Sequence, residues 1–230
     1  MPPAIEVHCI DLDRSDDDAD GRLATRDELD RASRFRHAVD ARRFLARRAA
    51  ARRLIGRRLG VPPRAIAFAY GRWGKPMLAG YRLQFSLSRS GPLMMLAMAD
   101  DLPVGCDIER QDPGRDLAAI AAGCFTRDEA RRIALLPGEA RVAAFYDCWT
   151  RKEAYLKAVG IGMSLPMSSF EFRCDANGSG VLDGESDAWT SIGWDPAPGY
   201  RAAVVAAGHA WAIDRRDGPA APCAVAEREH

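Results

Sequence analysis

The chain has 230 residues, of which 47% are hydrophobic and 28% are charged, and its formal net charge is +1. This balance argues against a chain that acts as a whole as a polycation on nucleic acid. Six Cys without a C-x-x-C pair and four His without metal-ligand spacing predict reduced thiols in a cytoplasmic protein. No apolar run approaches twenty residues, and the N-terminus lacks a basic segment followed by a hydrophobic one, so neither a membrane span nor a membrane partner is expected.

In chain order, the first half is predicted to form a strand, two helices and a hairpin, at residues 4–12, 26–38, 40–59 and 81–99. The acidic stretch Asp16-Asp17-Asp18 after the first strand is expected to be mobile. Short extended segments within residues 61–78 connect the second helix to the hairpin, whose turn is predicted at Ser90-Gly91-Pro92.

The second half is predicted to form helices and then antiparallel strands, with helices at residues 114–122, 126–135 and 139–159. Its last strands are predicted to pair as a hairpin over residues 199–213. From about Arg215 the chain is rich in Ala, Pro and charge, and residues 215–230 are therefore expected to be a disordered tail.

Because both halves combine a long helix with antiparallel strands, the sequence predicts an α+β fold of two similar lobes related by a pseudo-twofold duplication. Each lobe is expected to pack its long helix on a small antiparallel sheet. The lobes are placed at residues 1–103 and 104–214, with the active site in the cleft between them.

The helix predicted over residues 139–159 carries a charge on its apolar side. The apolar side chains that recur at helical spacing are Val142, Phe145, Tyr146, Trp149, Leu156 and Val159. Glu153 falls near the middle of this stripe, where a carboxylate must pair, protonate or coordinate a cation. The simplest alternative is a salt bridge to Lys157, four residues further along the helix.

A second acidic motif, Asp107-Ile108-Glu109, ends a predicted strand. Alternate side chains of a strand share a face, so Asp107 and Glu109 are expected to point the same way, about 6 to 7 Å apart. Together with Glu153 they would offer three carboxylates, and oxygen ligands are those that Mg²⁺ prefers. The alternative for the strand motif alone is a solvated strand end.

The positions of the few lysines also indicate a site near Glu153. The chain has thirty Arg but only three Lys, at positions 75, 152 and 157, all within GRWGKPM and WTRKEAYLKA. A rare Lys is typical of a compact point charge, as at a phosphate, although three residues can also coincide by chance.

These motifs resemble those of the Sfp-type 4′-phosphopantetheinyl transferases, which load carrier proteins from coenzyme A. The matching segments follow the family's order across roughly residues 30–175: DARRFLARRAAARRLIG (40–56), WGKPML (73–78), FSLSRS (85–90), GCDIE (105–109) and WTRKEAYLKAVGIGMSLP (149–166). The combination of GxDIE with W-[ST]-x-K-E-x-x-x-K about forty residues later is the specific part of this resemblance.

The resemblance implies catalytic and metal-binding roles in the lobe at residues 104–214. Asp107, Glu109 and Glu153 match the family's magnesium ligands, and Glu153 also matches a base that takes the proton of the carrier serine. Lys157 matches the lysine that contacts the pyrophosphate and steadies the leaving group. Whether Glu153 is the base or only a ligand stays open.

On the coenzyme A side, the resemblance implies roles in the lobe at residues 1–103. Lys75 and Pro76 match the segment that lines the adenine and ribose pocket, and Arg43 matches an arginine that grips the 3′-phosphate. Ser88 and Arg89 match a Ser-His pair at the same phosphate, so Arg89 replaces the usual histidine. Arginine holds phosphate bidentately and stays charged, and binding is therefore expected to survive.

The implied reaction is attack of a serine hydroxyl of an apo acyl or peptidyl carrier protein on the β-phosphate of coenzyme A, releasing adenosine 3′,5′-bisphosphate. It implies Mg²⁺ as cofactor, coenzyme A as co-substrate, a monomeric enzyme and a place in secondary metabolite biosynthesis. The sequence leaves open which carrier is modified.

Two alternative functions are also compatible with parts of the sequence. The first is a nucleic-acid-binding protein, because residues 26–64 hold thirteen Arg and four acidic residues. The Arg pairs recur every five residues, however, and so do not line one helix face as groove reading requires. The second is a non-catalytic carrier-binding homologue, which Arg89 keeps open and the intact acidic residues oppose.

Overall fold

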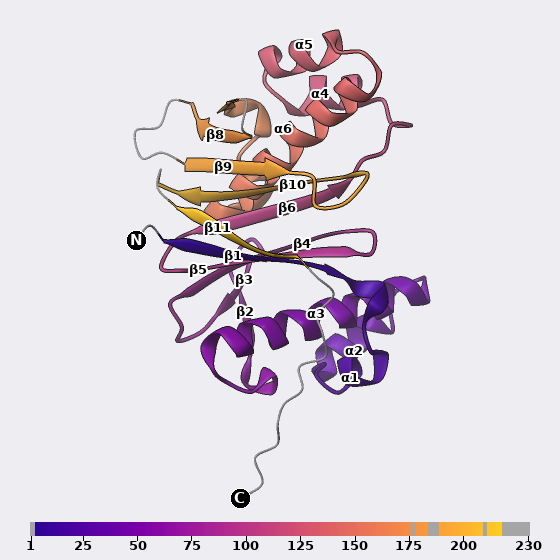
Figure 1. Ribbon diagram of the computed structural model, residues 1–230. Helices are drawn as coiled ribbons and strands as arrows, with labels where there is room; N and C mark the ends of the chain where they lie inside the picture. Colours follow the sequence, from indigo (N-terminus) through magenta and orange to yellow (C-terminus); the bar gives the residue numbers. More distant parts are fainter. Residues whose placement is uncertain (1–2, 176–177, 184–188, 209–210, 218–230) are drawn as a thin grey trace, which may run out of the picture.

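The computed structural model describes residues 3–175, 178–183, 189–208 and 211–217. Within them the same order of elements occurs twice: a strand, two short helices, a 22-residue helix and four strands (Figure 1). The first set comprises β1 (Ala4–Asp11), α1 (Asp17–Gly21), α2 (Arg26–Ala32), α3 (Ala38–Leu59), β2 (Phe68–Tyr70), β3 (Pro76–Leu78), β4 (Leu83–Ser90) and β5 (Leu93–Asp100).

The second set comprises β6 (Val104–Arg110), α4 (Leu117–Cys124), α5 (Arg127–Leu135), α6 (Gly138–Val159), β7 (Phe172–Cys174), β8 (Ser179–Leu182), β9 (Trp189–Trp194) and β10 (Tyr200–Ala207). A last strand, β11 (Ala212–Asp217), follows outside this repeat. Short 3₁₀ helices occur at Leu12–Arg14, Pro63–Ala65, Gly162–Ser164 and Met167–Ser169.

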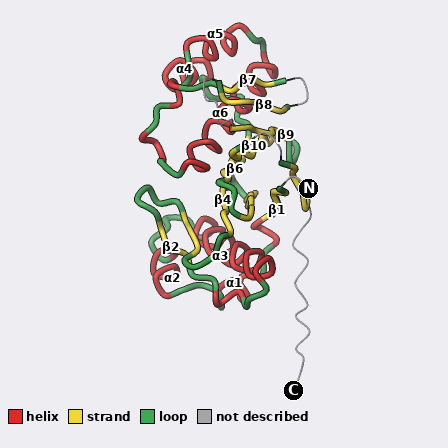
Figure 2. The backbone as a smooth tube through the Cα atoms, turned by 90° about the vertical axis from the view of Figure 1, so that its left-hand side faces the viewer, coloured by secondary structure: helices red, strands yellow, loops and turns green. Residues whose placement is uncertain are grey.

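The strands form two main sheets that repeat the same pairing. Their orders are β11-β1-β5-β4 and β6-β10-β9-β8-β7, and β2 pairs with β3 separately. The antiparallel neighbours β1, β5 and β4 correspond to β6, β10 and β9 in element order and in pairing. Figure 2 places β1, β4, β6, β9 and β10 between two groups of helices, α1 to α3 on one side and α4 to α6 on the other. The predicted α+β fold of two similar lobes is confirmed.

The two long helices are built alike and each covers one sheet. α3 buries a run of small and aliphatic side chains against β4 and β5, which lets the helix approach the sheet closely. α6 packs Ala154 and Tyr155 against Ala203 and Val205 of β10. Both helices end at a glycine in the left-handed region, Gly60 and Gly160, the conformation that commonly terminates helices.

The acidic stretch after β1 is a correction to the prediction. Residues 17–21 form helix α1, and the side chain of Asp16 accepts hydrogen bonds from the N–H groups of Asp18 and Ala19 at its start. Asp20 is buried and pairs with Arg53 of α3. The predicted mobility was wrong because tertiary pairing with α3 and a cap fix a segment whose composition alone indicates solvation.

The predicted hairpin over residues 199–213 is a second correction. β10 lies between β6 and β9, so both of its edges are already paired, and β11 instead adds to β1 in parallel, with Ile213 opposite Ile5. This strand continues to Asp217, so residues 215–217 do not belong to a disordered tail. Residues 218–230 lie outside the described part of the chain.

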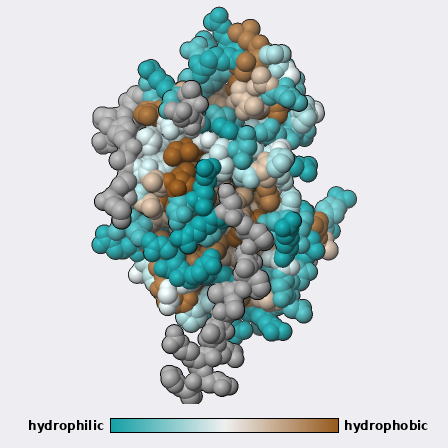
Figure 3. All heavy atoms as spheres, viewed as in Figure 1, coloured by the Kyte–Doolittle hydropathy of each residue, from teal (hydrophilic) through white to brown (hydrophobic). Residues whose placement is uncertain are grey.

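No helix among the described residues is long and apolar enough to cross a membrane. On the face drawn in Figure 3, hydrophobic side chains occupy small separate areas between hydrophilic ones.

Candidate active site

Strands β4 and β6 lie side by side where the two halves meet, and serine side chains join them. The serines at alternate positions of β4 share one face and all bond to β6; they are Ser86, Ser88 and Ser90. Ser86 Oγ accepts from the N–H of Cys106 at 3.0 Å, and Ser90 Oγ accepts from the N–H of Arg110 at 3.0 Å. The backbone of β6 is thereby held against β4 by side chains.

Asp107 is the most enclosed acidic group of this contact, with 2% of its surface exposed. Its Oδ1 accepts a hydrogen bond from Ser88 Oγ at 2.7 Å and one from Lys157 Nζ at 2.6 Å. Its Oδ2 is also buried, and it has no hydrogen-bond partner among the described residues. One oxygen of this buried carboxylate is thus hydrogen-bonded and the other is not. A buried oxygen without a partner destabilises the fold unless a further group binds to it.

Glu109 and Glu153 lie close enough to Asp107 for their charges to interact. Burial raises the pKa of Glu109; a hydrogen bond from Ser90 Oγ at 2.6 Å opposes the shift, and the charges of Asp107 and Glu153 add to it. Burial likewise raises the pKa of Glu153, opposed by Lys157 and supported by Asp107. Both carboxylates therefore sit where a cation would relieve burial and mutual repulsion.

A close contact between α6 and β6 brings Glu153 and Lys157 of the helix to Asp107 and Glu109 of the strand. A Cβ placed on Gly105 would lie 1.9 Å from the carbonyl oxygen of Ala154 and 2.4 Å from the nitrogen of Ala158. Only a glycine allows the strand to cross the helix backbone at this distance. The G-C-D-I-E order thus positions Asp107 two residues beyond the crossing.

Lys157 pairs with Asp107 rather than with Glu153. The simple alternative of a Glu153–Lys157 salt bridge within the helix is wrong, since the ion pair of Lys157 in the described structure is made from α6 to Asp107 of β6. Burial alone would lower the pKa of Lys157, but the charge of Asp107 raises it. Lys157 is therefore a fixed ammonium next to the buried carboxylate.

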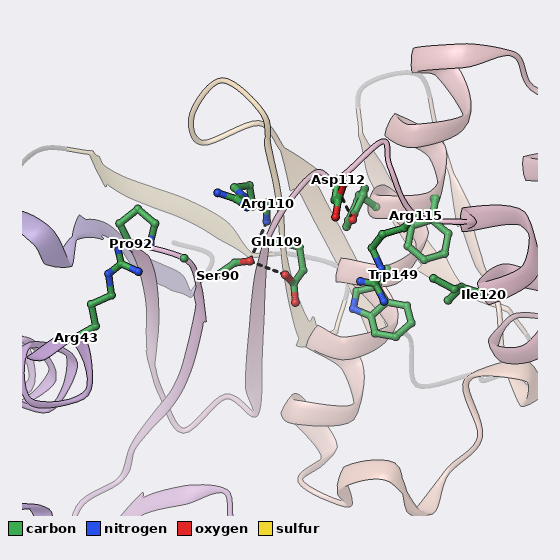
Figure 4. A pocket seen from close by; sticks show the side chains of 12 residues that line it. Arg43, Ser90, Pro92, Glu109, Arg110, Asp112, Arg115, Ile120 and Trp149 are labelled. Carbon is green, nitrogen blue, oxygen red and sulfur yellow. Dashed lines mark hydrogen bonds between the residues drawn. The ribbon is translucent and has the colours of Figure 1, made fainter. Parts of the chain in front are cut away.

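The carboxylate region opens into a cavity of about 440 Å³ between the halves. Figure 4 shows Arg43 and Pro92 on one side of it, Trp149 and Arg115 on the other, and Glu109 between them. Its lining comes from both element sets: Arg43, Ser90, Gly91, Pro92, Glu109, Arg110, Asp112, Arg115, Ile120, Phe145, Tyr146 and Trp149. The cavity carries three guanidiniums and two carboxylates, so anionic and polar ligands suit it.

Arg43 lines this cavity but already has an acidic partner. Its Nε and Nη2 bind both oxygens of Asp13, at 2.8 and 2.5 Å. This hydrogen-bonded pairing raises the pKa of Arg43 and lowers that of Asp13. A phosphate at Arg43 would have to share the guanidinium with Asp13 or displace it.

Ser88 and Arg89 point to opposite faces of β4. Ser88 is bound to Asp107 and Lys157, at 2.7 and 3.0 Å, whereas Arg89 Nη1 donates to the carbonyl of Gly91 at 3.1 Å. Adjacent residues of a strand alternate in direction, so the pair does not meet at one point. The structure brings Ser88 to the carboxylates and Arg89 to the side of α3.

The other two lysines bind backbone carbonyls. Lys75 Nζ donates to the carbonyls of Ala158, at 3.0 Å, and Val104, at 3.3 Å, and burial lowers its pKa. It thus caps the last turn of α6 from the first half, and neither it nor Pro76 lines the cavity with Arg43. Lys152 is 1% exposed and pairs with Glu129 at 2.8 Å, which leaves it no access to a phosphate.

Among the described residues, no three His, Cys, Asp or Glu side chains are already gathered closely enough to hold a metal ion. The ammonium of Lys157 supplies the positive charge at Asp107 instead. The predicted common face of Asp107 and Glu109 agrees with their bonds to Ser88 and Ser90, while Ile108 is fully buried on the other side.

Several residues of the β4–β6 contact and of the cavity wall were absent from the sequence prediction. Ser86 and Ser90 have a sequence signal, since every second residue of F-S-L-S-R-S is serine in a predicted strand. Arg110 ends β6, and Asp112 and Arg115 lie in the irregular segment after it. They have no sequence signal, because tertiary contacts decide which residues of this region face the cavity.

Comparison with known proteins gives one family throughout. Residues 103–205 match the family described as the 4′-phosphopantetheinyl transferase superfamily. The chain is 35% identical over 214 residues to the 4′-phosphopantetheinyl transferase HetI of a Nostoc species, covering 90% of each chain. It is 30% identical over 185 residues to the 4′-phosphopantetheinyl transferase Sfp of Bacillus subtilis, covering 79% of this chain and 81% of that one.

A crystal structure of a holo-(acyl-carrier-protein) synthase from Bacillus anthracis, solved in complex with coenzyme A, aligns with a TM-score of 0.41 and 22% identity. It covers 46% of this chain and 96% of its own. The similarity to HetI extends over 90% of the length of both proteins. The chain therefore belongs to the 4′-phosphopantetheinyl transferase superfamily.

Proposed function

We propose that this enzyme transfers the 4′-phosphopantetheine group of coenzyme A to a serine hydroxyl of an apo acyl or peptidyl carrier protein, with Mg²⁺ held by Asp107, Glu109 and Glu153. The observation that carries the proposal is the buried Oδ2 of Asp107, which has no partner among the described residues and lies beside two further carboxylates. The transfer itself is the reaction named for the relatives that match most of the chain.

The chemistry of the three carboxylates suits a hard dication, although in the described structure they are not gathered closely enough to ligate one and would have to draw together around it. All three side chains offer oxygen ligands, two of them have raised pKa values that a nearby positive charge would lower, and Lys157 already stands in for such a charge at Asp107. Bound there, Mg²⁺ would neutralise charge on the pyrophosphate and on the departing bisphosphate. Water and phosphate oxygens would complete its ligands.

The protein's own groups supply positioning and proton transfer. Lys157 stays protonated beside Asp107, and its ammonium can donate to a pyrophosphate oxygen entering the contact between α6 and β6. Glu153 is the candidate base for the serine proton, because its raised pKa brings it closer to neutral pH. Whether it accepts that proton itself or only binds the cation is decided by variants that separate the two roles.

The nucleotide end of coenzyme A is assigned to the first half, residues 1–103, and the acidic site to residues 104–214. Arg43 in the cavity wall and Arg89 on β4 are proposed to face the 3′-phosphate, with Lys75 and Pro76 near the adenine and ribose. Ser88 is proposed to orient Asp107 and Lys157 rather than the phosphate, since its Oγ bonds to both.

The arginine-rich region offers little to a nucleic acid. Several of its guanidiniums are committed within the protein, at Arg43–Asp13, Arg52–Glu28, Arg53–Asp20 and Arg58–Asp100. A monomeric state and a cytoplasmic location remain predictions.

The test is incubation of the purified protein with coenzyme A, Mg²⁺ and a panel of apo acyl and peptidyl carrier proteins, read by intact mass. We expect addition of one phosphopantetheine to at least one carrier and no addition when the carrier serine is replaced by alanine. Chelation of divalent cations should abolish the reaction, and added Mg²⁺ should restore it. If no carrier is modified while the protein binds duplex DNA with a steep salt dependence, the proposal fails.

A further inference from the structure

A second and larger cavity lies on the side of α6 that faces away from Glu153 and Lys157. It holds about 730 Å³, mainly between α5, α6 and β7, whereas the cavity at Glu109 holds about 440 Å³. α6 supplies residues 144, 147, 148, 151 and 152 to it, which lie on the other side of the helix from residues 149, 153 and 157. Figure 2 draws α5, α6 and β7 together at the end of the molecule away from α1 to α3. None of the residues that line this cavity has a role in the proposed transfer.

The buried charges of this second cavity are paired within the protein. Lys152 binds Glu129 at 2.8 Å, and Arg151 binds Asp147 at 3.0 Å. Most of the remaining lining is aliphatic, aromatic or thiol: Ile133, Leu136, Ala144, Cys148, Phe172 and Cys174. Burial raises the pKa of both thiols, so neither carries a charge near neutral pH. The interior of the second cavity therefore suits an apolar group, which would meet paired charges and neutral side chains there.

An exposed leucine extends the apolar lining to the protein surface. Leu135 is the last residue of α5, lines the second cavity and is 76% exposed, the highest value among the large hydrophobic side chains of the described residues. Ile133, two residues earlier, is buried in the core beneath it. A single exposed leucine is ordinary, but one that continues an apolar cavity is typical of a binding site. An apolar ligand in the cavity would cover Leu135 as well.

The exposed charges of the lining include a guanidinium from each of two elements. Arg132 of α5 pairs with Glu171, and Arg173 of β7 pairs with Asp183 at 2.7 Å. Both guanidiniums are largely exposed, and exposed ion pairs hold their side chains only weakly. Glu171 has a second donor, Thr126 Oγ1 at 3.0 Å. Arg132 can therefore share its N–H groups with another anion while Glu171 keeps a hydrogen bond.

We propose that the second cavity binds a carboxylate that carries a medium-length alkyl chain. The chain lies among Ile133, Leu136 and Phe172, and the carboxylate lies at the surface with Arg132. This arrangement matches the lining, whose interior is apolar and whose exposed guanidiniums attract a negative head group. The volume of the cavity also falls within the range of about 300 to 1,000 Å³ that is typical of small-ligand pockets.

The experiment measures binding of hexanoate, octanoate and decanoate to the full chain by calorimetry. If the alkyl chain is buried, each added CH₂ should strengthen binding about fourfold. Arg132→Met should weaken decanoate binding about two- to fivefold, because the contact is partly exposed, and should leave binding of uncharged decanol unchanged. Arg131→Met is the matched control: the neighbouring arginine is exposed and does not line the cavity, so neither ligand should be affected.

The thiols show where decanoate binds. Cys174 is exposed and lines the second cavity, whereas Cys124 in α4 does not line it. Saturating decanoate should slow the alkylation of Cys174 by iodoacetamide at alkaline pH, followed by peptide mass, and leave that of Cys124 unchanged. Ala144→Phe should fill the cavity from α6 and remove binding, whereas Ala143→Phe, at an exposed neighbour outside the lining, should not. Thermal melts establish that both variants fold, and Arg132→Met decides the question if Ala144→Phe does not.

Three results would each overturn the assignment: affinity that does not rise with chain length, equal effects of Arg131→Met and Arg132→Met, or unprotected Cys174. The carrier assay tests the proposed transfer separately, since none of the substituted residues takes part in it. Carrier modification without decanoate binding would leave the transfer intact and remove the second site. Decanoate binding without modification of any carrier would leave the second site and remove the transfer.

Discussion

At the scale of single residues, Asp107 joins the structural and chemical roles of the site. Its Oδ1 completes a buried bond network with Ser88 and Lys157, while Oδ2 stays unpartnered within the described structure. A residue kept only for stability would be expected to satisfy both oxygens, since an unmade buried bond costs about 1 to 3 kcal/mol. The imbalance is typical of a group that completes its bonding with a ligand.

Asp107→Asn should abolish most transfer activity while leaving the fold intact, because asparagine keeps the shape and the Ser88 contact but loses the charge. We expect a fall in kcat of about 100-fold or more, equivalent to about 2.7 kcal/mol of lost transition-state stabilisation. Asp101→Asn, the same change at an exposed turn, is the control. Near-wild-type turnover of Asp107→Asn at saturating Mg²⁺ would contradict the metal assignment.

The raised pKa values of Glu109 and Glu153 predict a pH-dependent effect of Mg²⁺ on stability. A carboxyl whose pKa is raised by folding stabilises the fold at pH values below its ordinary pKa, and this contribution is lost as the pH rises through the folded value. A cation binds the ionised forms, so the gain in melting temperature with Mg²⁺ should increase between about pH 5 and pH 8.

Thermal melts with and without Mg²⁺ across that range measure the effect. The variant with both Glu109→Gln and Glu153→Gln should melt at nearly the same temperature with or without the ion at every pH. A gain from Mg²⁺ that is constant with pH, or that persists in the double variant, would argue against these two carboxylates as ligands.

At the scale of elements, the crossing of β6 over α6 determines the site. The backbone of Gly105 meets the helix between Ala154 and Ala158, so the strand and the helix approach without intervening side chains. This closeness places Asp107 within 2.6 Å of Lys157 and in electrostatic range of Glu153. The motif G-C-D-I-E therefore encodes a close contact as well as the two residues proposed as ligands.

Gly105→Ala should be destabilising and nearly inactive, because its methyl group would overlap backbone atoms that cannot move aside separately. We expect at least about 2 kcal/mol lost in the free energy of unfolding from urea titration. Gly123→Ala in α4 is the matched control: nothing lies within 4 Å of its added Cβ, and alanine favours a helix by about 0.5 to 1 kcal/mol. Equal stability of the two variants would refute the close crossing.

At the scale of the whole molecule, the two sheets share one core. Ile5 and Met95 of the first sheet pack in the same buried cluster as Ile108 and Val204 of the second. The strand β11 strengthens this connection, since the end of the chain returns to pair with β1. The two halves repeat the same order of helices and strands, but apolar side chains of both sheets are buried against each other. Separating the halves would expose these side chains to water, which makes separate folding unfavourable.

The shared core predicts a single cooperative unfolding transition for both halves. Met95→Ala, at a fully buried position between the sheets, should cost about 2 to 5 kcal/mol and move the whole transition. Urea titrations followed by far-ultraviolet circular dichroism and by tryptophan fluorescence should coincide before and after the substitution. Two separated transitions, with only one shifted by Met95→Ala, would show independent halves.

Much of the fold follows from local periodicity. Helical spacing predicted α3 and α6 to within two residues, and the turn at Ser90-Gly91-Pro92 between two extended segments predicted the hairpin of β4 and β5. The similar order of elements in the two halves predicted the α+β repeat. The D-x-E spacing also predicted the shared face of Asp107 and Glu109. These features depend on residues that are close together in the chain, which is why a single sequence is enough to predict them.

Contacts between distant segments were decided only by the tertiary structure. The sequence offered Glu153 as an alternative partner of Lys157 because it is four residues away, yet the crossing at Gly105 brings Asp107 closer. The same holds for β11, which joins β1 because β10 has no open edge. It also holds for the thirteen arginines of residues 26–64, because only the fold decides which of them, such as Arg52 and Arg53, meet an acidic partner. The sequence by itself determined most of the elements and the family. Charge pairing was decided only by the residues that packing brings together, because pairing depends on distances that no local pattern encodes.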